Sequence, residues 1–348
     1  MVIEMVRSNL VSINVSPPTV FQINITNTQN TATSVPFQQM IQLPISQLGL
    51  INPYIRNIGT LRFSYNGSYI PAWLESINNG TATIWVKLPV SIPANSSITI
   101  DMKVDPTLNF DGNYWGENPL LSSTYGQYDD GSNVFNFYDN FVGTTLNSKW
   151  TSGTSGGSYT VNNGLTITLP YNAASGSYVY VSTSSYTVTS AQIIESYANL
   201  NGFNTTNFRM VPVGLTQYNN VPWHADLYEN ENGVGWVGDA QSRGGISAIA
   251  TTSSNANYFQ TSLIDSTSSY QLWGILYPDN NSVSVQYNYS NWGSTTTYVP
   301  ATPLYITISN YIYPSQNIIQ TTYPINVYYI RARAYPPNGV MPSVEVIA

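Results

Sequence analysis

The chain has 348 residues, of which 42% are hydrophobic, so it is long enough for two domains and rich enough in apolar residues to fold. Only 8% are charged, the net charge is −7 and no basic run occurs, which excludes nucleic acid as a natural partner. The absence of cysteine and the single His224 exclude disulfides, thiol chemistry and histidine-rich metal sites.

No apolar run approaches the roughly 20 residues of a membrane span, so we expect no direct membrane insertion. Residues 1–20 also lack the apolar core of a signal peptide. Either a signal was removed before this numbering begins, or the protein is never secreted through one, as for a virion protein assembled in the cytoplasm. We expect an extracellular or cell-surface location, with the virion surface as the alternative.

The polar surface must come mainly from amides, hydroxyls and the 28 tyrosines, because so few residues are charged. Amides and hydroxyls do not titrate in acid, and few carboxylates are present to be protonated. The composition therefore suits a protein exposed to acidic surroundings. A general bias in amino-acid usage is the alternative explanation.

Residues 1–18 form a separate N-terminal segment, in which Leu10–Val15 reads as a strand ahead of Pro17 and Pro18. We expect this strand to pair within its own domain. The alternative is that it completes the sheet edge of a neighbouring copy.

Residues 19–108 carry the signals of a first β-sandwich. Ile98–Val104 alternates apolar and polar residues, the pattern of a half-buried strand. The predicted strands cover 21–26, 37–43, 61–65, 69–75, 84–88 and 98–104, and about seven short strands are typical of a sandwich. Residues 109–133 then crowd turn formers with aromatic residues, which indicates a packed connector.

Residues 134–348 carry a second, longer series of strands. Asn163 and Gly164 predict a hairpin turn, because both residues tolerate positive φ. Further strands are expected at 178–182, 191–198, 209–215, 224–228, 246–251, 270–277, 283–289, 304–309 and 327–334. The fold class is therefore all-β, with two tandem β-sandwiches, the second a larger jelly roll.

The first sandwich resembles the DUF2341 family. The resemblance is carried by 61–63, Ile70-Pro-Ala-Trp73-Leu-Glu75, 82–86 and 92–98. That family has no settled activity, and it implies a surface-exposed bacterial or archaeal protein in which a lectin-like sandwich often follows.

The second sandwich resembles the concanavalin-like lectin/glucanase group. Phe137–Trp150 is similar to that group's opening strand and turn, 270–285 to its long hairpin, and Val327–Arg333 to its closing strand. These diffuse patterns are more specific for fold than for function.

The segment from Trp223 to Glu231 looks the most reactive. Retaining glucanases of this group carry Glu-x-Asp-x-x-Glu, and need two carboxyl groups about 5–5.5 Å apart. Here His224, Asp226 and Glu229 align with that pattern, which puts an imidazole where the nucleophile should be. We therefore expect no catalytic residue and no enzyme activity, and the glycoside hydrolase remains the minor alternative.

The same segment is the candidate glycan site, because aromatic rings can stack on sugars while carboxylates and amides bind hydroxyls. Its candidates are Trp223, His224, Asp226, Tyr228, Glu229, Glu231 and Trp236. Trp292 lies in a further probable rim segment. The alternative reading is core or edge packing, which is the commoner role of large aromatic residues.

Eight sequons provide glycosylation candidates, at Asn14, Asn24, Asn66, Asn79, Asn95, Asn204, Asn280 and Asn288, although a chain rich in Asn, Ser and Thr forms sequons by chance. We predict no cofactor and no metal site. Asp129, Asp130 and Asp139 could offer oxygens to a structural Ca²⁺, but turn formation alone explains them.

The leading hypothesis is a non-catalytic extracellular surface protein with a structural or adhesive role, whose partners are glycans or copies of itself. The alternatives are a subunit of an extracellular filament or virion surface that exchanges β-strands between copies, and a glycoside hydrolase.

Overall fold

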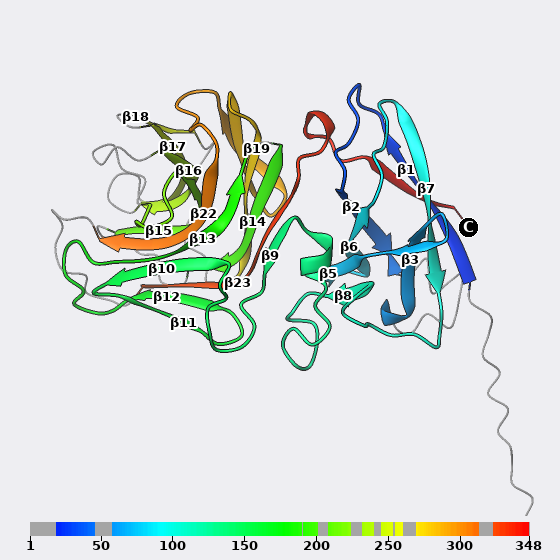
Figure 1. Cartoon of the computed structure of the whole chain (residues 1–348), viewed down its shortest axis with the longest axis horizontal. Coiled ribbons are helices and arrows are strands. Elements are labelled where there is room, and N and C mark those ends of the chain that lie inside the picture. The colour runs from blue at the N-terminus through cyan, green and yellow to red at the C-terminus, as the bar shows by residue number, and fades with distance from the viewer. Residues whose placement is uncertain are drawn as a thin grey trace, which may run out of the picture.

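The computed structural model describes residues 19–45, 58–189, 191–200, 208–223, 232–239, 245–252, 255–259, 269–312 and 323–347. It confirms the all-β fold, because four sheets of mainly antiparallel strands form two sandwiches that lie side by side (Figure 1). In the described residues, the short helix α2 (Gly131–Val134) and the 3-10 turns Ile58–Thr60 and Pro337–Gly339 accompany the strands. Among these residues no helix is long and apolar enough to cross a membrane.

The first sandwich consists of a five-stranded and a four-stranded sheet. The larger sheet has the order β24-β1-β7-β3-β4. Its strands are β24 (Ser343–Ile347), β1 (Thr19–Asn27), β7 (Ser96–Val104), β3 (Leu61–Tyr65) and β4 (Ser68–Ile70). The smaller sheet has the order β2-β6-β5-β8, formed by β2 (Phe37–Pro44), β6 (Thr81–Leu88), β5 (Ala72–Asn78) and β8 (Trp115–Glu117).

The second sandwich is larger. Its seven-stranded sheet is formed in order by β10 (Trp150–Ser155), β13 (Tyr178–Val188), β22 (Leu304–Ile312), β15 (Phe208–Thr216), β16 (Gly233–Asp239), β17 (Gly245–Thr252) and β18 (Asn255–Tyr258). Its eight-stranded sheet is formed by β11 (Ser158–Val161), β12 (Leu165–Leu169), β23 (Tyr323–Ala334), β14 (Gln192–Asn199), β19 (Gln271–Asp279), β20 (Ser282–Tyr287) and β21 (Ser290–Thr295), while β9 (Phe137–Asp139) pairs with β23.

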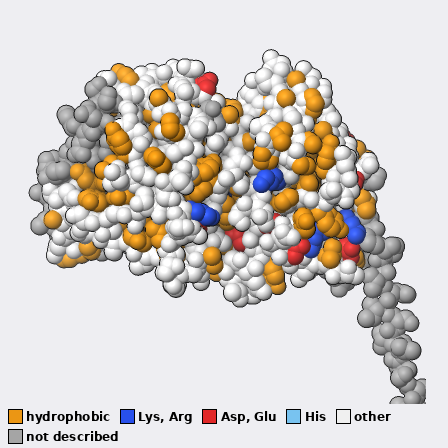
Figure 2. Space-filling model, viewed as in Figure 1, with side chains coloured by type: hydrophobic (Ala, Val, Ile, Leu, Met, Phe, Trp, Pro, Cys, Tyr) orange, Lys and Arg blue, Asp and Glu red, His pale blue; other side chains and the backbone are white. Residues whose placement is uncertain are grey.

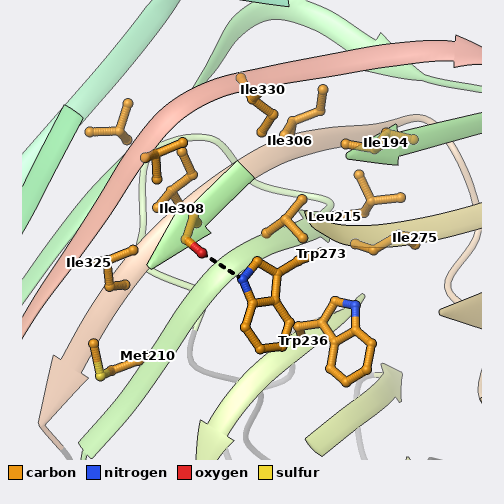
Figure 3. Packing of buried hydrophobic residues seen from close by; sticks show 14 of the residues in the cluster. Ile194, Met210, Leu215, Trp236, Trp273, Ile275, Ile306, Ile308, Ile325 and Ile330 are labelled. Atoms are coloured by element: carbon orange, nitrogen blue, oxygen red, sulfur yellow. Dashed lines mark hydrogen bonds between the residues drawn. The ribbon is translucent and has the colours of Figure 1, made fainter. Parts of the chain in front are cut away.

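The core of the second sandwich lies between these two sheets, and it is built from the alternate residues that each strand turns inward. Trp236 from β16 and Trp273 from β19 meet edge to face there, with ring centroids 5.3 Å apart. Isoleucines from both sheets pack around the two rings (Figure 3). The Trp273 indole donates a hydrogen bond to the Ala198 carbonyl, so the buried N–H has a partner.

Most predicted strands are present, and the predicted hairpin joins β11 to β12, with positive φ at Asn163 and Gly164. The predicted strand at 224–228 and the N-terminal segment 1–18 lie outside the described residues. The predicted connector contributes β8, which extends the four-stranded sheet through a parallel pairing with β5.

The last strand departs from the predicted division of the chain, in which residues 134–348 formed one domain. β24 returns to the first sandwich and pairs with β1, from Gln22 opposite Ile347 to Thr26 opposite Ser343. Its Val344 and Val346 pack on the first core. The second sandwich is therefore inserted between strands of the first.

The two sandwiches meet through the outer faces of the four-stranded and eight-stranded sheets. The contact cluster includes Trp73 and Trp85 from the first sandwich, and Tyr138, Leu272 and Tyr329 from the second. Helix α2 contributes Val134 to the same cluster. Because each of these sheets is covered on both faces, the four sheets form consecutive packed layers.

Candidate functional site, the interdomain joint and cleft

A buried ionic network joins the two sandwiches. Its members are Glu75 on β5, Glu195 on β14, and Arg331 and Arg333 on β23. Strand pairing places Glu195 directly opposite Arg331, and period-2 alternation turns Arg331 and Arg333 to the same outer face. The position of each charge therefore follows from the register of β14 against β23.

The network is tightly bonded. Arg331 donates from Nε to Glu195 at 2.7 Å and from a terminal nitrogen to Glu75 across the interface at 3.2 Å. Arg333 donates to the two Glu195 oxygens at 3.1 and 2.8 Å. Burial opposes ionisation of Glu195, but the two guanidinium groups outweigh it and lower its pKa to about 2. Glu195 is therefore held in its charged form between the two arginines.

Aromatic rings surround the network. The Arg331 guanidinium carbon lies 4.9 Å from the Trp85 ring centroid and 4.8 Å from that of Phe135, and Arg333 lies 4.7 Å from Trp85. The Trp85 indole donates to Glu75 at 2.6 Å. Such cation–π contacts strengthen when water is excluded, so the rings help to compensate the lost hydration of the guanidinium groups.

Asp129 forms a second link between the sandwiches. Its carboxylate accepts hydrogen bonds from the Trp73 indole of β5 at 2.8 Å and from the Tyr138 hydroxyl of β9 at 2.6 Å. It also accepts from the Asn140 side chain and the Gly131 amide. Burial raises the pKa of Asp129 although these four donors oppose the rise. The connector thus acts as a packed part of the joint.

These contacts withdraw charge from the exterior. Within the described part of the chain, nine charged residues are buried: Arg62, Glu75, Asp105, Glu117, Asp130, Asp139, Glu195, Arg331 and Arg333. The face shown in Figure 2 accordingly carries few Lys, Arg, Asp or Glu side chains among the hydrophobic and other groups. Charged residues are almost never fully buried unless paired, so this distribution is unusual.

A cleft of about 450 Å³ opens beside the network, between the two sandwiches. Its lining comes from the first sandwich (Glu75, Ser76, Asn78), the connector (Asn118, Leu120, Leu121) and the second sandwich (Tyr197, Leu272, Asn288, Tyr289, Tyr329). The Tyr289 hydroxyl lies 2.6 and 2.5 Å from the Glu75 oxygens and receives a hydrogen bond from Arg331. The cleft volume is in the range of small-molecule sites.

The arrangement offers no obvious nucleophile or general acid. The Glu75 carboxylate is occupied by Trp85, Tyr289 and Arg331, and Glu195 is occupied by two arginines. What this geometry can do chemically is hold two domains in one orientation and present polar and apolar groups to a bound molecule.

Two of the predicted glycan residues, Trp223 and Trp236, lie within the described chain, and neither lines this cleft. Trp223 and Trp236 are fully buried. Trp236 packs in the core, and Trp223 covers Gly214, Gly233 and Gly235, where a Cβ atom would lie 2.3–2.9 Å from its ring. The expectation that these two rings are available for sugar stacking is therefore corrected. Trp292 is half-buried and packs against the same core.

The remaining candidates, His224, Asp226, Tyr228, Glu229 and Glu231, lie outside the described residues. The glycan-binding and catalytic readings of this segment therefore stay predictions. Sequence reasoning did not assign a role to Glu75, Glu195, Arg331 or Arg333. The available signal was their isolation, since charges are rare in this chain and these four stand within apolar or aromatic strands.

The predicted sequons serve as turn residues. Asn66, Asn79, Asn95 and Asn288 have φ between 48° and 51°, in the left-handed region that asparagine tolerates. They are exposed, as is Asn280, whereas Asn24 is half-buried on β1. Asn14 and Asn204 lie outside the described residues. Turn geometry therefore explains these four asparagines, and their glycosylation stays a prediction.

Of the acidic residues considered for Ca²⁺, Asp129 and Asp139 are engaged by donors, whereas Asp130 keeps one carboxyl oxygen without a described hydrogen-bond partner. Asp129 accepts four hydrogen bonds, as above, and Asp139 accepts from the Phe141 amide and the Trp150 indole. In the part of the chain that the structure describes, no three His, Asp or Glu side chains gather as metal ligands. N–H and O–H donors would oppose a cation at Asp129 and Asp139, and the free oxygen of Asp130 alone supplies too few ligands for Ca²⁺, so the residues present do not fit the ion.

Comparison with known proteins gives two matches along the sequence. Residues 57–109 match the family described as domain of unknown function DUF2341. The chain is also 30% identical over 366 aligned residues to Uncharacterized protein 562 of Sulfolobus islandicus rod-shaped virus 1, with 97% of this chain covered. The chain spans about 60% of the length of that viral protein.

Solved structures that resemble the chain include glucanase-type proteins. One is LamAcat from Zobellia galactanivorans, with a TM-score of 0.44, 11% identity, and coverage of 57% of this chain and 97% of that one. Another is described as an immunostimulatory antigen and pseudo beta-1,3-glucanase of Mycobacterium tuberculosis, with a TM-score of 0.42, 9% identity, and coverage of 57% and 98%.

Proposed function

We propose that the chain is a non-catalytic structural and adhesive protein that forms part of an exterior surface, that of a virus particle or of a cell. The observation that carries the proposal is the interdomain joint, because it makes one stiff body of two sandwiches and places scarce charges inside. An exterior of amides and hydroxyls keeps its character when pH or salt changes. Similarity to a viral protein along 97% of the chain favours the virus particle.

The test is the accessibility of the chain on intact particles or cells that produce it. Brief protease treatment should release peptides of this chain, identified by mass spectrometry, while an internal protein stays uncut. Peptides that are released only after lysis would contradict an exterior position.

A subunit that assembles with copies of itself is the second candidate. β24 is an edge strand of its sheet, so its outer backbone groups are open to pairing with another chain. Light scattering after size-exclusion chromatography should then show oligomers that disappear when residues 1–18 are deleted. A monomer at all concentrations would remove this candidate.

The glycoside hydrolase is the remaining alternative, and it would depend on Glu229 and Glu231. We expect no reducing sugar to be released from β-glucans, because His224 stands at the nucleophile position. Release above background that Glu229→Gln abolishes would overturn the non-catalytic proposal.

A further inference from the structure

We propose that the interdomain cleft binds a neutral oligosaccharide. This inference rests on the proposed surface role, and it concerns other residues than those of the Trp223–Glu231 segment. Three parts of the chain meet at the cleft, from β5, the connector and the second sandwich. Because the ionic network fixes both walls, the cleft exists before a ligand arrives, and little ordering is required on binding.

The charges at the cleft favour a neutral ligand. Among the described lining residues Glu75 alone is charged, and Arg331 already pairs with that carboxylate at 3.2 Å. The Trp85 indole and the Tyr289 hydroxyl occupy the same oxygens. A cation would therefore have to displace existing bonds, while an anion would meet a carboxylate and no basic side chain among the described lining residues.

Polar groups in the cleft retain hydrogen-bonding capacity. Among the described residues, the Asn118 amide donates once, to the Glu75 carbonyl, and the Asn288 amide donates once, to Gln271, so each has one N–H without a described partner. Asn78 donates once, to Ser76, and also keeps one. The Tyr197 hydroxyl forms no hydrogen bond with another described residue. These groups can donate to or accept from the hydroxyls of a sugar.

Apolar groups complete the match. Leu120 and Leu121 of the connector are exposed at 40% and 44%, which is unusual for neighbouring leucines. The backbone amide of Leu120 is held by the Asn118 side chain at 3.1 Å and that of Leu121 by the Asn118 carbonyl at 2.8 Å, so both residues are fixed beside the amides. A sugar presents C–H faces and hydroxyl edges together, and this lining offers both surfaces.

The experiment is calorimetric titration of the full chain with neutral hexose tri- and tetrasaccharides, and with uronic acid oligosaccharides of equal length. We expect the neutral sugars to bind with a Kd on the order of micromolar to millimolar. Asn288→Gly should weaken binding about tenfold, because glycine keeps the positive φ while the side-chain amide is lost.

Asn163→Gly is the matched control, because Asn163 is also a left-handed turn residue whose side chain accepts one backbone N–H, far along the chain from the cleft. It should leave the Kd within about twofold, since one lost hydrogen bond outside the site does not touch the ligand. Leu121→Ala is a second cleft variant that keeps every side-chain hydrogen bond, and it should weaken binding about threefold.

Absence of binding at millimolar sugar would overturn the inference, as would tighter binding of the acidic sugars. Equal affinity of Asn288→Gly, Leu121→Ala and the unmodified chain would also overturn it, and so would a loss confined to Glu229→Gln, which would place the site on the other segment. The protease experiment on intact particles gives an independent result, so an exterior protein with an empty cleft and an internal protein that binds sugar are distinguishable.

Discussion

At the scale of single residues, several of the few charged side chains form buried ion pairs that link the two sandwiches. Arg331 is fully buried and bonded to glutamates from both sandwiches. A buried ion pair is a weak source of net stability compared with an apolar pair, but removing one partner leaves the other charge without compensation. The main effect of the network is therefore to favour one relative orientation of the two domains, in which every buried charge has a partner.

Glu195→Gln should lower the free energy of unfolding by about 3–5 kcal/mol, because Arg331 and Arg333 would then remain buried with one carboxylate fewer. Equilibrium unfolding in guanidinium chloride measures the change. Glu345→Gln on exposed β24 is the control and should stay within about 0.5 kcal/mol of the unmodified chain. Equal effects of the two substitutions would show that the network does not hold the joint.

Asp130 behaves in the opposite way to Glu195. Its side chain is buried, one carboxyl oxygen has no partner, and burial raises its pKa to about 8 from an ordinary value of 3.8. The native state therefore holds this proton more tightly than the unfolded chain. The stabilising contribution of protonated Asp130 to the free energy of unfolding is fully present below about pH 4 and is lost as the pH rises toward 8.

Asp130→Asn should remove this dependence. Between pH 5 and pH 8 the unmodified chain should lose stability by up to about 1.4 kcal/mol per pH unit from this group, and the variant should show a flatter profile. Unfolding titrations at four pH values measure the slope. Asp101→Asn on β7 is the control, and a variant with the slope of the unmodified chain would refute the assignment.

At the scale of elements, the glycines of β15 and β16 leave space for the ring of Trp223 on the face of the sheet. β16 carries Gly233 and Gly235 two positions apart, so both lie on the same face of the sheet, and β15 contributes Gly214. The ring of Trp223 occupies the space where side chains would stand. The outer face of the sheet is thus shaped to receive one large ring.

Gly214→Ala should destabilise the protein by about 1–3 kcal/mol, because its Cβ would lie 2.6 Å from the Trp223 ring. The same substitution should cost less in a Trp223→Leu background, where the ring is gone. Thermal unfolding of the four proteins in this cycle gives the interaction. Equal costs in both backgrounds would show that the ring does not set the glycine requirement.

The strands that sequence predicts best are those that alternate apolar and polar residues, such as β1 and β7. The sequence does not predict β16, because glycine has low strand propensity. Its glycines are required by the ring of Trp223, which comes from another segment of the chain. β24 escapes as part of the first sandwich because partner choice over more than 300 residues leaves no local signal. The contact between the two sandwiches is not predicted from the sequence for the same reason, since Glu75 and Arg331 meet only after both sandwiches form.

At the scale of the whole molecule, the pH effects combine. Glu195 is stabilising above about pH 4.5 and loses its contribution as the pH falls toward 2, whereas Asp130 favours acid. With 17 acidic residues in 348, few further carboxylates are available for protonation to destabilise the fold. Stability should therefore be greatest on the acidic side of neutrality.

We accordingly expect a cooperative thermal transition to persist at pH 3, observed by circular dichroism as loss of β-sheet signal. Glu195→Gln should reduce the difference between pH 5 and pH 3, because the group that loses its contribution in that range is absent. Loss of the transition between pH 7 and pH 3 would contradict acid tolerance.

The pairing of β1 with β24 also determines how the molecule bears tension. The strands are antiparallel, so residue 19 and residue 347 lie at the same end of the pair. A pull applied at these two points would load the ladder one hydrogen bond at a time, as in unzipping, and β24 would peel away at low force. Until it did so, the inserted second sandwich would lie outside the force path, and a ligand in the cleft would experience no strain.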